Sequence, residues 1–262
     1  MDRAARRAIA ILLAGLLGAF SVVAALAPAQ WAAQAVGRAT QGRLLVLDAD
    51  GTVWSGEGSL VLADAASGSS TGIRLPGRMR WRLGFWPLLR GTLAVSLEDE
   101  AALSGPLRLR AGRDGTYEAS ACSLRVPAAA LAGLGAPWNT IRPGGELRLE
   151  WQELHGQGGA VDGAWSGEWI GATSALTPIA PFGHYRLRGE GLRPGVPLHL
   201  ETVAGPLEMS GDGTIGTDGR FRLRGRARVQ SGTDETVATQ LSGLVSLLGR
   251  REGDGAILDF GT

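Results

Sequence analysis

Apolar and polar residues alternate with a period of two along much of the chain. Met79, Trp81 and Leu83 alternate with arginines, and the same alternation recurs over residues 93–97 and 147–151. Such alternation is typical of a strand with one packed face and one wet face. The pattern predicts an all-β fold of antiparallel sheets.

Two stretches depart from this period. Residues 128–134, directly after Pro127, suit two turns of helix. Near the C-terminus an acidic start at Asp234 and Glu235 and a stop at Gly249 bracket apolar residues at helical spacing. These residues are Val237, Leu241, Leu244, Val245 and Leu248. The spacing predicts a short C-terminal amphipathic helix that lies on a sheet or on a partner.

The N-terminus has a different pattern. Residues 8–27 carry no charge, Arg3, Arg6 and Arg7 precede them and Pro28 follows. Such a run is long enough to cross about 30 Å of hydrocarbon as a helix. By the positive-inside rule the N-terminus stays cytoplasmic and the chain after Pro28 is exported. Residues 27–29 also fit a signal-peptidase site, but the run exceeds the usual 7–15 apolar residues of a signal peptide, which favours an uncleaved anchor.

The tetrad WSGE occurs twice, beginning at Trp54 and at Trp165. Further landmarks follow in the same order after each copy, including Gly-Pro-Leu at residues 105–107 and 205–207. The shared order predicts two duplicated β units, residues 31–140 and 141–262, after a stub and anchor over residues 1–30. The alternative is that all-β chains share a Gly-rich alternating texture.

The duplication assigns structural roles to the two tetrads. We expect Trp54 and Trp165 at equivalent places, each filling one end of a sheet. Gly56 and Gly167 would then lie where a bulge or a close backbone approach requires glycine.

Composition limits the classes of function. The 262 residues are 44% apolar and have a net charge of +1, which gives no argument for a nucleic-acid partner. The 41 Gly and 12 Pro separate short apolar stretches, as expected for an all-β chain. The single cysteine, Cys122, excludes an intrachain disulfide and a multi-cysteine metal site, and suits a small buried position.

Several short matches to catalytic motifs lack the structural context that the chemistry needs. Residues 68–72 fit G-x-S-x-G around Ser70, but in a small-residue loop rather than between a strand and a helix. Residues 211–216 fit G-x-G-x-x-G without a βαβ unit. His155, His184 and His199 are too far apart for a local metal motif. The sequence therefore predicts no catalytic residue, no metal site and no cofactor, and a protein that is not an enzyme.

Two features indicate binding surfaces. Arginine occupies every second position at Arg220, Arg222, Arg224, Arg226 and Arg228. The row is either a solvated face that discourages edge aggregation or a docking stripe for an acidic partner or a lipid head group. Trp31 and Trp86 suit a membrane interface, where indole rings are favoured.

The chain resembles protein N of the type II (general) secretion pathway. The resemblance rests on the N-terminal Arg cluster and anchor, "GTVWSGEGSLVL", "RMRWRLGFWPLLRGTLAVSL", "LTPIAPFGHYRL", "LHLETVAGPLEMSGDGTIG" and "GRFRLRGRARV". It implies a single-pass protein of the bacterial inner membrane with a periplasmic body and no enzyme activity. It also implies partners among the inner-membrane platform proteins and the outer-membrane secretin, and supplies no partner-binding residue.

Two functions of different class stay open at this point. In the first, the exported domain is an accessory module that assists export of folded periplasmic proteins through protein–protein contacts. In the second, the sheets form an open groove that holds a lipid chain. We expect apolar residues on both strand faces in a lipid groove, so the Arg-rich alternation favours the first.

Overall fold

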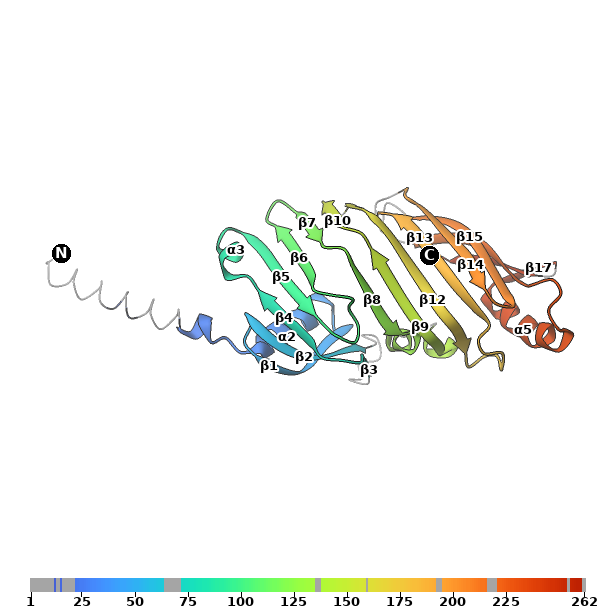
Figure 1. Ribbon diagram of the computed structural model, residues 1–262, viewed down its shortest axis with the longest axis horizontal. Helices are drawn as coiled ribbons and strands as arrows, with labels where there is room; N and C mark the ends of the chain where they lie inside the picture. Colours follow the sequence, from blue (N-terminus) through green and yellow to red (C-terminus); the bar gives the residue numbers. More distant parts are fainter. Residues whose placement is uncertain are drawn as a thin grey trace.

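The computed structural model describes residues 12, 15, 22–63, 72–134, 138–158, 160–191, 195–215, 221–253 and 255–260. These residues form two antiparallel sheets of nine strands each, which confirms the mostly β prediction. Short helices accompany the sheets: α2 (Ala29–Ala39), α3 (Phe85–Leu89), α4 (Trp138–Ile141), α5 (Glu235–Leu248) and the 3₁₀ helix η1 (Ala128–Leu134). Figure 1 shows the strands side by side along the long axis of the molecule.

The first sheet follows the chain closely. Its order is β1 (Leu44–Gly51), β2 (Ser55–Ala63), β4 (Met79–Leu83), β5 (Thr92–Glu98), β6 (Leu107–Gly112), β7 (Thr116–Ala119), β10 (Leu154–Gln157) and β11 (Ala160–Asp162), with β3 (Gly72–Arg74) paired to β2. The predicted strand residues share a face, because Trp81 lies opposite Leu97 and Leu83 opposite Val95.

The second sheet runs from the C-terminal strands back to the middle of the chain. Its order is β17 (Arg250–Glu252), β18 (Gly255–Phe260), β16 (Phe221–Val229), β15 (Leu207–Ile215), β14 (Pro197–Ala204), β13 (Gly183–Glu190), β12 (Ala164–Ser174), β9 (Pro143–Trp151) and β8 (Cys122–Pro127).

Three stretches of chain pass from one sheet into the other. Only residues 120–121 separate β7 from β8, residues 152–153 separate β9 from β10, and Gly163 separates β11 from β12. The Trp151 indole N–H donates to the Ser120 carbonyl at 2.9 Å beside the first bend. The sheets are thus continuous through these bent strands, and membership of a sheet does not follow the predicted unit boundary at residue 140, which stays a prediction.

The predicted C-terminal helix is α5. The Asp234 carboxylate accepts hydrogen bonds from the N–H groups of Thr236 and Val237, which caps the first turn, and Gly249 follows the last residue. Residues 128–134 form η1, so the second departure from strand periodicity is helical as well.

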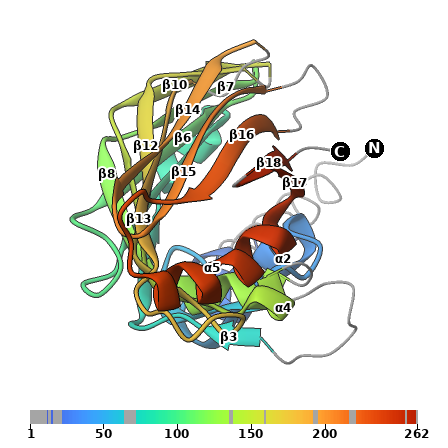
Figure 2. The same ribbon diagram turned by 90° about the vertical axis from the view of Figure 1, so that its right-hand side faces the viewer.

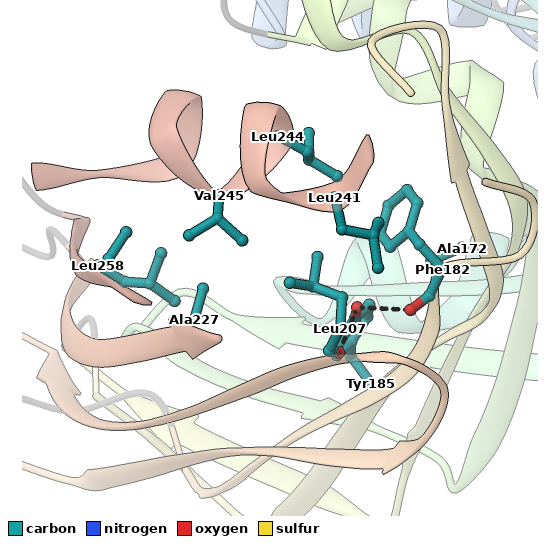
Figure 3. Packing of buried hydrophobic residues seen from close by; sticks show 10 residues of the cluster. Ala172, Phe182, Tyr185, Leu207, Ala227, Leu241, Leu244, Val245 and Leu258 are labelled. Atoms are coloured by element: carbon teal, nitrogen blue, oxygen red, sulfur yellow. Dashed lines mark hydrogen bonds between the residues drawn. The ribbon is translucent and has the colours of Figure 1, made fainter. Parts of the chain in front are cut away.

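The main core lies between α5 and the second sheet. Leu241, Leu244 and Val245 of the helix face Leu207 and the strands β16 and β18 (Figure 3). Figure 2 shows the sheet curving around the side on which α5 lies. We call this side of the second sheet the inner face and the opposite side the outer face.

An aromatic group closes the core next to Leu207. The rings of Trp169, Phe182 and Tyr185 contact one another with centroids 5.6 to 6.2 Å apart. The Tyr185 hydroxyl donates to the Leu207 carbonyl at 2.9 Å (Figure 3). Burial raises the pKa of Tyr185 well above its ordinary value, because the phenolate would lose its hydration.

The predicted membrane anchor, residues 8–27, lies mostly outside the described residues. In the part of the chain that the structure describes, none of the helices has the length and apolar character needed to cross a membrane. The end of the run is described and is joined to the first sheet: the Val53 N–H donates to the Ala27 carbonyl at 2.9 Å, and Pro28 bridges Thr52.

Candidate functional site

The two WSGE tetrads occupy related but unequal places. Trp54 directly precedes β2, whereas Trp165 lies within β12. Each indole N–H donates to a backbone carbonyl, from Trp54 to Ala24 at 2.7 Å and from Trp165 to Gly191 at 2.9 Å. These bonds use the one polar group of each ring. Both tryptophans therefore have structural contacts.

The glutamates of the tetrads both lie opposite arginine on the next strand. Glu57 pairs in register with Arg80, and Glu168 with Arg186. After each tetrad, the meander continues in one order, β2-β4-β5-β6-β7 and β12-β13-β14-β15-β16. Equal order and equal charge placement support the predicted duplication, which stays a prediction.

Glycines opposite aromatic residues explain part of the Gly content. Gly56 pairs in register with Trp81, and a Cβ at Gly56 would lie 2.5 Å from the Trp81 ring. Gly189 pairs with Trp165 in the same way, with a Cβ distance of 2.8 Å. A Cβ at Gly56 would also lie 2.6 Å from the Asp50 carbonyl oxygen, while the shared structural role of the two tetrad glycines stays a prediction. At Gly167 the nearest atom is Cδ2 of Leu149 at 3.2 Å, a milder crowding.

The inner face of the second sheet is apolar across its width. Residues directly opposite in neighbouring strands share a face, so a row can be followed from β8 to β18. One row consists of Leu124, Leu149, Gly167, Leu187, Leu200, Gly211, Gly225 and Leu258. The next consists of Cys122, Trp151, Trp165, Gly189, Leu198, Gly213 and Leu223.

Helix α5 covers only the C-terminal part of this face. Leu258 and Leu207 are fully buried beneath it, whereas Leu149 is 41% exposed and Trp151, Trp165 and Leu187 are half-buried. From β8 to β13 the inner face thus includes partly accessible apolar side chains, with Trp151 and Trp165 among them, whereas Leu198 of β14 is fully buried.

The outer face is polar along the matching row. The row consists of Ser123, Glu150, Ser166, Arg188, His199, Asp212, Arg224 and Asp259. The predicted arginines extend along β16 on this face, with Arg222, Arg224, Arg226 and Arg228 exposed; Arg220 lies outside the described residues. The alternation read from the sequence therefore separates an apolar inner face from a charged outer face.

The arginines of β16 differ in their partners. Arg228 donates to Glu208 at 2.8 Å, and Arg224 lies 3.8 Å from Asp259. Arg226 lies between Ser210 and Ile257 in the strand register and forms no ion pair with the described residues. It lines a groove of about 810 Å³ whose other charged residues are Arg228, Glu201, Glu208 and Glu252. Arg226 thus differs from Arg224 and Arg228, which each lie within 4 Å of a carboxylate of the described residues.

A second charged cluster stabilises the outer face near β12 and β13. The Arg186 guanidinium donates to Glu168 at 2.6 Å and holds the pKa of that carboxyl below its ordinary value, while Glu168 raises the pKa of Arg186. The buried His184 Nε2 lies 3.6 Å from the other Glu168 oxygen without a hydrogen bond to any described residue. Glu168 and Arg186 thus pair with each other within the sheet.

The structure places some of the residues that the catalytic motif matches raised. Among the described residues no three His, Cys, Asp or Glu side chains converge on a metal position, and each histidine lies beside a different carboxylate. Ser70 lies outside the described residues. Cys122 is only half-buried, which differs from the buried position expected, and it lies on the inner face within 3.7 Å of the Ser104 hydroxyl.

Comparison with known proteins identifies the family. The model of the family "Type II secretion system (T2SS), protein N" matches residues 42–258, which is most of the chain. In the searches of curated proteins and of solved structures, nothing matched this chain significantly. The chain therefore belongs to the type II secretion system protein N family, whose members are accessory secretion components.

Proposed function

We propose that this member of the type II secretion protein N family is a single-pass inner-membrane protein that assists export of folded periplasmic proteins through protein–protein contacts. Family membership supports the role in secretion. The uncharged residues 8–27, with arginines before them, support an anchor with a cytoplasmic N-terminus and a periplasmic β body. The expected partners are platform proteins of the inner membrane, with the outer-membrane secretin as a further candidate.

The contact that we propose uses the outer face of β16. Arg226 carries this assignment, because it is exposed beside a groove and lies opposite no acidic residue in the strand register. An arginine left without a partner carboxylate is suited to a charge-assisted bond with an acidic partner. Its neighbours Arg224 and Arg228 form ion pairs with Asp259 and Glu208, so the surface around Arg226 is charged.

Complementation of a gene deletion tests this proposal. Full-length protein should restore secretion of a folded cargo, and Arg226→Glu should lower it about tenfold while leaving the protein level unchanged. Arg108→Glu, at an exposed arginine of the first sheet, is the matched control and should secrete normally. Equal secretion by the two variants would remove Arg226 from the contact. In the same strain the native protein should migrate with a full-length standard, and not with one that begins at Ala29.

A second candidate is a lipid chain held against the inner face. It is favoured by the half-buried Trp151 and Trp165 and the exposed Leu149 on a face whose rows hold apolar residues and glycine. The arginine alternation does not oppose this function, because the arginines lie on the outer face. The expectation that a lipid groove needs apolar residues on both strand faces does not apply to a curved sheet, because a chain held inside the curve would contact the inner face alone.

Mass spectrometry of purified protein distinguishes this candidate. A stoichiometric lipid that is lost in Leu149→Glu would support it, with Ser123→Glu on the outer face as the control. Lipid retained equally by both variants, or absent from the wild type, would count against it.

A further inference from the structure

The turn between β4 and β5 exposes a compact apolar surface. None of the residues of α3 is buried. Phe85 is 47%, Trp86 70% and Leu89 63% exposed, and Leu88 and Leu93 beside them are also exposed. We call these five residues the β4–β5 tip. An exposed apolar group of this kind marks a contact surface on a soluble body.

The tip is connected to the end of the uncharged N-terminal run. Trp54 links the two, because its indole N–H donates to the Ala24 carbonyl at 2.7 Å and its ring packs edge-on against Phe85 at 5.2 Å. Phe85 in turn contacts the Trp86 ring at 5.7 Å. Next to Ala24, Val22, Val23 and Leu26 are more than half exposed. Contacts through Trp54 therefore join the end of the run to the exposed residues of the tip.

Basic residues border this surface on the side of the β body. Arg90 follows α3 directly, and the Arg113 side chain lies over Gly91, where a Cβ would approach its Cδ and Nε atoms at 2.7 Å. Arg90, Arg110 and Arg113 line one shallow groove together with Asp114 and Glu118, and Arg110 is 4.0 Å from Glu118. At a membrane surface, tryptophan rings lie at the edge of the hydrocarbon and arginines lie at the level of the phosphate groups. The tip and its neighbouring arginines have this arrangement.

From this connection we propose that the β4–β5 tip inserts into the surface of the bilayer that holds the N-terminal anchor. Trp86 and Leu89 enter the acyl region near the head groups, and Arg90 and Arg113 lie at the level of anionic phosphates. Two points of attachment hold the first sheet at a fixed angle to the membrane, because a single helix alone leaves the body free to tilt. The proposal rests on the membrane anchoring given under Proposed function.

A nitroxide label on the tip tests the insertion. Full-length protein with Cys122→Ser, which removes the single cysteine, would carry Leu89→Cys and be placed in vesicles of phosphatidylethanolamine and phosphatidylglycerol. We expect the label to collide more often with oxygen than with a water-soluble nickel complex. The matched control is Gln240→Cys on the exposed side of α5, where nickel should prevail.

The outcomes separate the tip from the anchor. A Leu89 label that is as accessible to nickel as the Gln240 label overturns the inserted tip, even when alkaline washing leaves the protein in the membrane. Release of the protein by alkaline washing would overturn the anchor. The Leu89 label would still report independently whether the tip is inserted.

Discussion

At the scale of single residues, aromatic rings pack against glycines of the neighbouring strand. The Trp165 indole N–H donates to the Gly191 carbonyl, and this bond favours the ring position against Gly189. The sequence reveals the tryptophan and the glycine but not their pairing, because the opposite residue depends on which distant strand lies alongside. The roles of Gly189 and Trp81 were therefore missed, whereas the crowding at Gly56 was predicted from its place in the tetrad.

Substitution of Gly189 tests the packing of the Trp165 ring against this glycine. Gly189→Val should lower the free energy of unfolding by about 1–3 kcal/mol, because the new side chain meets Trp165 and Leu198 at 2.8 Å. Strand propensity alone predicts the opposite sign, since valine is a better strand former than glycine. Urea unfolding would measure the change, with Gly105→Ala, which has open space around it, as control. A Gly189→Val protein as stable as the wild type would refute the packing role.

Glu168 predicts a pH dependence of stability. Arg186 holds the folded-state pKa of Glu168 below the unfolded value of about 4.3. The pair therefore stabilises the fold above that pH, and the contribution is lost as the pH falls through the folded-state pKa. Glu168→Gln should be less stable than the wild type by about 1 kcal/mol at pH 7, with the difference shrinking below pH ~4. Urea unfolding of both proteins at pH 7 and below pH ~4 checks this. A stability difference of equal size at the two pH values would contradict it.

At the scale of elements, residues close in the sequence were sufficient to predict α5. They were insufficient to predict where the strands bend from one sheet into the other. Both ends of α5 follow from short-range signals, the Asp234 cap and Gly249. The single strands likewise follow from alternation within a few residues. The bends at residues 120–121 and 152–153 depend on the pairing of β8 with β9 and β7 with β10, contacts that no local pattern contains.

The packing of α5 carries a prediction of its own. Leu241→Ala should lower the free energy of unfolding by about 2–5 kcal/mol, because Leu241 is fully buried against Leu207 and Phe182 and leaves a cavity. Gln240→Ala, one residue earlier on the exposed side, should change it by less than about 0.5 kcal/mol. Thermal or urea unfolding compares the two. Equal effects would mean that α5 does not hold the sheet.

At the scale of the whole molecule, a curved sheet separates two surfaces of opposite chemistry. The inner face offers apolar area beyond the reach of α5, and the outer face offers charge, with Arg226 as an arginine without an ion pair among the described residues. The sequence predicted one apolar face and one charged face, because the alternation assigns each residue to one of the two faces. It could not predict that the faces are the inside and outside of one curve, because curvature arises from the assembled strands.

In-cell photocrosslinking from a residue beside Arg226 tests the proposed docking surface most directly. Ser210 is exposed and lies opposite Arg226 in the strand register, so a photoreactive residue replacing Ser210 leaves Arg226 in place. It should capture a subunit of the type II secretion machinery in secreting cells, while the same residue at Arg108 should capture none. Capture of the same subunit from both positions, or of no subunit from position 210, would contradict docking through the outer face of β16.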